Sequence, residues 1–88
     1  MQSPEILSIL SELLNNYQID ASVRLEINSG ESAARILPVL GTAPQAVFSL
    51  LEGLCREMSF TLPMIRYAIV DFQNHSKPTI VDCSRYQK

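Results

Sequence analysis

Residues 21–28, ASVRLEIN, alternate between apolar and polar side chains and constrain the fold more than any other stretch. A period of two places the apolar members on one side of an extended chain and the polar members on the other. The pattern therefore predicts a half-buried β-strand, with Arg24 and Glu26 on its solvent side. The residues Asn28-Ser29-Gly30 are turn formers, and we expect them to end this strand.

Apolar side chains at spacings of three and four predict two amphipathic helices, at about residues 4–17 and 42–58. Thr42 is the expected N-cap of the second helix, because Gln45 follows it at the spacing of a capping box. Pro44 then falls in the first turn of this helix, where a missing N–H costs little.

A shorter helix is expected at residues 31–37, ESAARIL. Pro38 would close this helix, because the residue before a proline avoids helical backbone angles. The adjoining residues 36–44, ILPVLGTAP, form an apolar stretch that Pro38 and Gly41 interrupt. We expect this interruption to be a corner between two helices, with Gly41 in a left-handed conformation.

Two further strands complete the pattern. Residues 64–72 are β-rich and apolar on both sides, as in a central strand, and residues 79–83 form a short last strand. Residues 84–88 are expected to be a loose tail. The sequence thus predicts a single α+β domain over residues 1–88 in the order α-β-α-α-β-β. Its sheet would have three strands, with the helices packed on one face.

Charge and hydropathy argue against a nucleic-acid-binding or membrane-spanning protein. Seven Lys and Arg against nine Asp and Glu give a net charge of −2, without a run of basic residues. A basic patch would form only if folding gathered Arg24, Arg35 and Arg66 on one face. No segment approaches the ~18 apolar residues of a membrane span, and the N-terminus lacks the pattern of a signal peptide. We therefore expect a cytoplasmic protein that makes no membrane contact.

Candidate catalytic side chains are few. The one arrangement that merits a test joins a thiol to a histidine and a carboxylate, drawn from Cys55, Cys83, His75, Asp71 and Asp82. A thiol nucleophile needs a base within hydrogen-bond reach and a third group that orients the base. His75 lies in a polar turn, and Cys55 lies on the apolar side of its helix, where cysteine behaves as a small hydrophobe. We expect both cysteines to be reduced, and we predict no catalytic residue, no metal site and no cofactor.

The β-α-turn-α-β order expected for residues 22–72 resembles that of K-homology (KH) domains, in which a Gly-x-x-Gly loop lies between two helices. Residues 36–51, ILPVLGTAPQAVFSLL, are similar to the LLIGxxGxTLDALQYL pattern of the bacterial Jag-type group. Gly41 matches the second glycine of that loop, and Pro38 stands in place of the first. The resemblance implies a KH-like scaffold and, through the family's loop, binding to RNA.

The loop residues point to a different ligand. Val39 and Leu40 cannot contact a phosphate, and Pro38 removes an N–H that could. Apolar residues at a surface corner are instead suited to contact with protein. The alternative for Leu40 is that its side chain folds inward between the two helices and belongs to the core. We therefore expect a non-catalytic interaction module that contacts a protein partner or a second copy of itself. Its interaction loop would consist of Pro38, Val39, Leu40, Gly41 and Thr42.

The alternative is a KH-type RNA-binding protein with a degenerate loop. Its nucleic-acid contacts, expected to be weak, would come from Arg24, Arg35 and Arg66. The two hypotheses differ in their response to salt. Binding through phosphates weakens steeply as salt rises, whereas an apolar protein contact does not.

Overall fold

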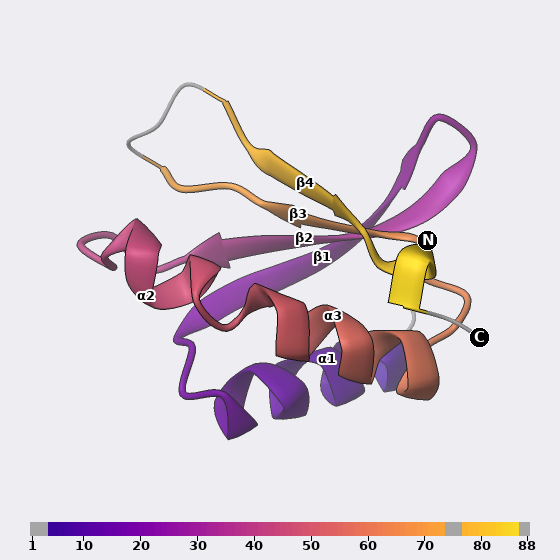
Figure 1. The fold of residues 1–88 in the computed structure, drawn as a ribbon, viewed down its shortest axis with the longest axis horizontal. Helices are drawn as coiled ribbons and strands as arrows, with labels where there is room; N and C mark the ends of the chain where they lie inside the picture. Colours follow the sequence, from indigo (N-terminus) through magenta and orange to yellow (C-terminus); the bar gives the residue numbers. More distant parts are fainter. Residues whose placement is uncertain (1–3, 74–76, 87–88) are drawn as a thin grey trace.

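The computed structural model describes residues 4–73 and 77–86. The elements follow in the order α1 (Pro4–Asn16), β1 (Ala21–Asn28), β2 (Glu31–Pro38), α2 (Pro44–Phe48), α3 (Leu51–Thr61), β3 (Tyr67–Val70), β4 (Thr79–Asp82) and the 3-10 helix η1 (Cys83–Tyr86). The strands form one sheet in the order β1-β2-β3-β4 (Figure 1). Strands β2 and β3 are parallel, and the other pairs are antiparallel. The α+β class is confirmed, but the sheet has four strands where three were expected.

The additional strand is β2, which occupies the residues expected to form a short helix. Ser29 and Gly30 have φ angles of 55° and 81°, and Asn28 pairs with Glu31 across them. Two consecutive residues with positive φ are typical of a type I′ turn, which turns one strand directly into its antiparallel neighbour. The helix prediction for residues 31–37 was therefore wrong, because the turn at its start sends the chain back along β1.

Burial explains why an alanine-containing segment with good helix propensity is extended here. Strand β2 lies between β1 and β3, and the side chains of Ala33 and Ala34 are both 0% exposed, on opposite faces of the sheet. A central strand gains burial on both faces and hydrogen bonds on both edges, which outweighs a preference of a few tenths of a kcal/mol per residue. Pro38 ends this strand rather than a helix.

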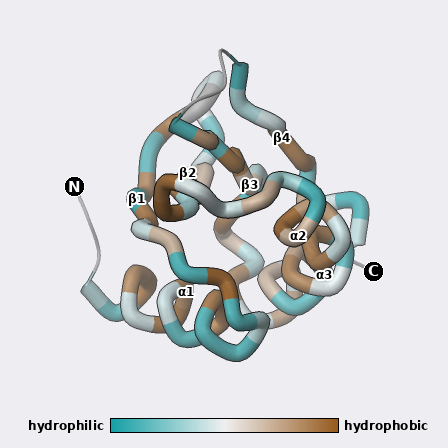
Figure 2. The backbone as a smooth tube through the Cα atoms, turned by 90° about the vertical axis from the view of Figure 1, so that its left-hand side faces the viewer, coloured by the Kyte–Doolittle hydropathy of each residue, from teal (hydrophilic) through white to brown (hydrophobic). Residues whose placement is uncertain are grey.

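Helices α1 and α3 lie side by side on one face of the sheet (Figure 2). The core between helices and sheet includes the fully buried side chains of Leu10, Leu14, Ile36, Leu54, Met58, Leu62, Ile65 and Val70. As expected, β3 is more buried than β4. Of the three helices expected on one face, the first is found there as α1 and the last there as α3, whereas the middle one is strand β2. Helix α2 lies at the end of the sheet where β2 finishes (Figure 1).

The helix expected at residues 42–58 is in fact two helices. Helix α2 ends at Phe48, a turn follows at residues 49–50, and α3 continues to Thr61. The N-cap of α2 is Ala43, without a side-chain hydrogen bond, so the expected capping role of Thr42 was wrong. Pro44 does occupy the first turn, as expected.

The C-terminal region is more ordered than expected for a loose tail. Residues 83–86 form η1, in which Cys83 is buried, and residues 87–88 lie outside the described part of the chain. Across the described residues, no helix combines the length and apolar character that crossing a membrane requires.

Candidate functional site

Residues 39–42 form a tight turn that joins β2 to α2 (Figure 1). The backbone N–H and the hydroxyl of Thr42 both donate to the carbonyl of Val39, at 3.1 and 2.7 Å. Gly41 has a φ of 94°, as the third position of a type II β-turn requires. The N–H of Val39 donates to the carbonyl of Asp20 at 3.0 Å, which ties the turn to the residue before β1.

Leu40 occupies the second position of this turn, which we call the Leu40 turn. Its side chain is 72% exposed, and that of Val39 is 42% exposed. Pro38 is buried at the end of β2, so it supports the turn and does not contribute to its surface. The expected interaction loop is therefore reduced to residues 39–42. It connects a strand to a helix, and not two helices as the sequence suggested.

A further exposed apolar residue lies on α2. Phe48 is 37% exposed, and its ring meets the buried ring of Phe72 edge-on, with centroids 5.6 Å apart and planes at 89°. This arrangement fixes the ring orientation. The region around α2 therefore combines a rigid turn with an anchored aromatic ring.

Two of the three arginines expected to bind nucleic acid, Arg35 and Arg66, are paired with carboxylates. Arg24 and Arg35 lie opposite each other in the β1–β2 register. Arg35 donates through Nε to both carboxylate oxygens of Glu26, at 3.0 and 2.9 Å, and through Nη1 to Asp71 Oδ2 at 2.7 Å. These hydrogen bonds from Arg35 lower the pKa of Glu26. Arg35 thus connects β1 with the residue after β3, and its charge is balanced by carboxylates.

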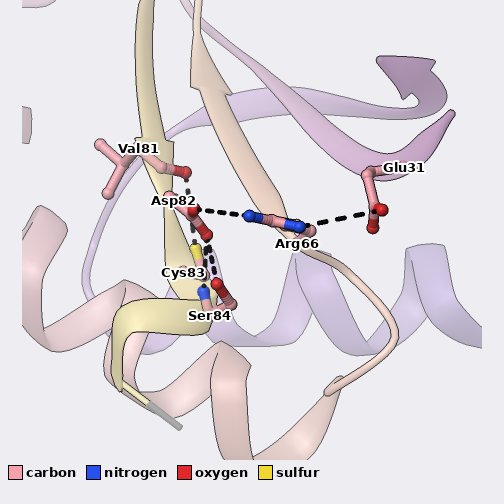
Figure 3. Close-up of polar contacts among 6 residues, drawn as sticks. All are labelled: Glu31, Arg66, Val81, Asp82, Cys83 and Ser84. Carbon is pink, nitrogen blue, oxygen red and sulfur yellow. Dashed lines mark hydrogen bonds and ion pairs between the residues drawn. The ribbon is translucent and has the colours of Figure 1, made fainter. Parts of the chain in front are cut away.

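Arg66 lies just before β3, between Glu31 and Asp82 (Figure 3). Its Nη2 is 3.3 Å from Asp82 Oδ2, and its Nη1 is 3.8 Å from Glu31 Oε1. Hydrogen bonds from Ser84, and then from Arg66, lower the pKa of Asp82. Folding therefore places Arg24 and Arg35 together but keeps Arg66 apart, and Arg35 and Arg66 both face carboxylates.

Cys55 of α3 and Cys83 of η1 both lie in the core, where η1 packs against α3. Both are 0% exposed, and the Cys83 thiol donates to the carbonyl of Val81 at 4.0 Å. The interaction with Cys83, and then burial, raises the pKa of the Cys55 thiol. Nothing in the sequence indicated this packing, because it joins segments that are far apart in the chain.

The remaining members of the catalytic hypothesis are dispersed or undescribed. Asp82 is hydrogen-bonded to Arg66 and Ser84, and Asp71 to Arg35. His75 lies outside the described residues. Within residues 4–73 and 77–86, no three His, Cys, Asp or Glu side chains gather as a metal site would require.

Comparisons with family models, with curated proteins and with solved structures give no match to this chain. Only the geometry of the chain itself therefore bears on its function. Leu40 is a bulky aliphatic side chain held away from the core by a hydrogen-bonded turn, and among the large apolar residues Phe60 and Ile27 are about equally exposed, at 72% and 71%.

Proposed function

We propose that this protein is a non-catalytic interaction module that binds a protein partner through the Leu40 turn. The observation that carries the proposal is the 72% exposure of Leu40 at the second position of a turn closed by two hydrogen bonds from Thr42. An apolar side chain in this position contributes little to the core. Its burial against a partner would contribute about 1.5–3 kcal/mol.

The rigidity of the turn supports this proposal. A binding loop that is already ordered loses less conformational entropy on association, which increases the net affinity. The left-handed Gly41 and the hydrogen bonds to the Val39 carbonyl hold the turn in one conformation. Interfaces obtain most of their binding energy from a few anchors inserted into pockets of the partner. Leu40 would be such an anchor, with Val39 beside it.

A protein partner fits this surface better than RNA does. The Leu40 turn has no basic side chain, and the carboxylates of Glu26, Asp71 and Asp82 balance Arg35 and Arg66. The succession β2-α2-α3-β3 retains the β-α-α-β order of a KH domain, but residues 49–50 between its helices are Ser and Leu, without glycine. The KH resemblance is therefore proposed for the scaffold only.

Affinity capture from the native cell tests this proposal, with the full chain as bait. The variant Leu40→Ser is compared with Phe60→Ser, a matched control because Phe60 on α3 is also 72% exposed. Each capture is repeated with nuclease and at high salt. Circular dichroism and thermal melting confirm that both variants are folded.

We expect one partner to be retained by the wild type and by Phe60→Ser and to be lost with Leu40→Ser, regardless of nuclease and salt. Loss of the partner after nuclease treatment would favour the alternative that the protein binds RNA. Equal capture by all three proteins would exclude the Leu40 turn as the contact.

A further inference from the structure

We infer that the partner of the Leu40 turn is a second copy of this chain, and that each copy inserts Leu40 into a hollow beside the same turn of the other. The inference rests on the proposed function, because it names the occupant of that binding surface. Three observations carry it: the position of the hollow, the lack of charge around the turn, and the size of this end of the molecule.

The hollow has a volume of about 330 Å³ and lies between helix α2 and the residues that follow α1. Its apolar lining comes from Ile19, Ala46, Val47 and Leu50. Ile19 and Val47 are buried, so part of this lining is fixed by the core. A cavity of about 150 Å³ is enough to hold benzene in other proteins. The hollow therefore has room for the isobutyl group of a leucine.

The turn and the hollow belong to one ordered surface. Thr42 lines the hollow and also closes the turn through its hydrogen bonds to the Val39 carbonyl. Asp20 lines the hollow as well, and its carbonyl accepts the hydrogen bond from the N–H of Val39. The α1–β1 connection and the β2–α2 turn lie at the same end of the molecule, on the left of Figure 1 and towards the viewer in Figure 2. A twofold axis through this end can bring each Leu40 to the hollow of the other copy, which is an isologous contact.

The lack of charge around the turn favours a second copy as the occupant. All seven Lys and Arg and all nine Asp and Glu lie outside residues 36–51, which contain the turn and α2. Two chains that each carry a net charge of −2 can meet through this segment without placing like charges opposite each other. Among the described residues, Asp20 is the one charged residue that lines the hollow, and it is exposed at its rim.

The size of this end of the molecule predicts a weak dimer. The Leu40 turn lies at one end of the longest axis, and the extents of the chain across that axis are 24 and 23 Å (Figure 1). This cross-section, roughly 500 Å², is smaller than the ~800 Å² that each partner buries in a standard interface. We therefore expect a dissociation constant of about 10–100 µM. At the lower protein concentrations of a denaturation experiment the chain is then mainly monomeric.

Nuclear Overhauser effects between chains test the inference without any substitution. A mixture of isotope-labelled and unlabelled full chains at about 1 mM, where most copies are paired, reports contacts from one copy to the other. We expect such contacts between the methyl groups of Leu40 and those of Ile19 and Val47, and none from Phe60. Contacts between chains that do not involve Leu40, or that join it to residues outside the hollow, would overturn the inference.

Sedimentation equilibrium supplies a matched comparison of variants. The wild-type mass should rise from 9.8 kDa towards twice that value as the concentration increases. Leu40→Ser removes the inserted side chain and Ala46→Leu occupies the hollow, so each should weaken the dimer at least about tenfold. Phe60→Ser should dimerise as the wild type does, because Phe60 lies near the end of α3. Circular dichroism confirms that each variant is folded.

A chain that stays monomeric at about 1 mM, or a dimer that Leu40→Ser leaves intact, would show that a second copy does not occupy the Leu40 turn. Either result is distinct from a failure of the proposed function, which is decided by the affinity capture. A different protein that is lost with Leu40→Ser in that capture would support the proposed function and overturn the present inference.

Discussion

Gly53 of α3 lies directly against Tyr17, so that a Cβ at Gly53 would be 3.2 Å from the Tyr17 hydroxyl oxygen and 3.4 Å from its Cε1. A glycine within a helix ordinarily lowers the stability of the helix by about 1 kcal/mol relative to alanine. In the structure this glycine gives room to the aromatic residue that follows α1. The close approach of α1 and α3 thus depends on a missing side chain.

This contact predicts an unusual outcome for Gly53→Ala. The gain in helix propensity, about 1 kcal/mol, should be largely offset by displacement of Tyr17. In a Tyr17→Ala background the same substitution should stabilise the protein by about 1 kcal/mol. Urea denaturation of the double-mutant cycle measures the difference. Equal effects of Gly53→Ala in both backgrounds would show that Tyr17 does not restrict this position.

The hairpin turn predicts a specific cost at Gly30. Its φ of 81° suits glycine, and Gly30→Ala should destabilise the protein by about 1–2 kcal/mol through backbone strain alone. No atom outside the turn would meet the new Cβ. Ser29→Asn is the matched control, because asparagine tolerates a left-handed conformation and should be neutral or slightly stabilising. Thermal melts that rank the two variants in the opposite order would contradict the turn assignment.

The ion pair between Glu26 and Arg35 predicts a dependence of stability on pH. Because the folded state lowers the pKa of Glu26 from its ordinary value near 4.5, the ionised carboxylate stabilises the fold above that pH. The contribution should disappear as the pH falls through the lower folded-state pKa. Glu26→Gln should therefore cost about 1 kcal/mol at neutral pH and almost nothing in strong acid.

Denaturant midpoints of wild type and Glu26→Gln, measured from neutral to acid pH, test this dependence. Glu52→Gln is the control, because Glu52 and its partner Arg56 are 62% and 56% exposed and 3.9 Å apart. That variant should change stability little at any pH. A difference between wild type and Glu26→Gln that persists unchanged in acid would show that the ion pair is not its source.

Substitutions at Leu54 and Leu40 distinguish a residue needed for folding from one proposed for binding. Leu54 is 1% exposed and Leu40 is 72% exposed. Leu54→Ala should destabilise the domain by about 2–5 kcal/mol, because it leaves a cavity in the core. Leu40→Ala should cost less than about 0.5 kcal/mol. If denaturation gave similar losses for both, Leu40 would be a core residue and the proposed contact would be untenable.

Local sequence patterns correctly predicted the elements in which intrinsic propensity and burial favour the same secondary structure. The alternation in residues 21–28 is found as β1, and the amphipathic pattern of residues 4–17 as α1. Residues 31–37 were misread because two alanines favour a helix locally, whereas the chain reversal at Ser29 and Gly30 and burial in the sheet decide the outcome. The spacing of two turn residues between two eight-residue segments was the available signal of a hairpin.

The site was predicted in part. The sequence predicted that Val39 and Leu40 are exposed but left open that Leu40 folds inward, and in the structure both are exposed. The sequence did not predict that the break joins a strand to a helix, because residues 31–37 were expected to be helical and instead form β2. The ion pair of Arg35 with Asp71, and the packing of η1 on α3, join distant segments. No local pattern indicates such contacts, because packing alone creates them.

Site-specific photo-crosslinking shows directly whether Leu40 contacts a protein partner. A photoreactive phenylalanine analogue replaces Leu40 in the full chain, and in a matched protein it replaces Phe60, which is equally exposed at 72%. After irradiation in the native cell, crosslinked products are resolved by mass and identified, with and without nuclease. If the Leu40 turn binds a protein, we expect a nuclease-resistant protein adduct from position 40 and none from position 60. No adduct at position 40, or equal adducts at both positions, would show that the Leu40 turn is not the binding surface.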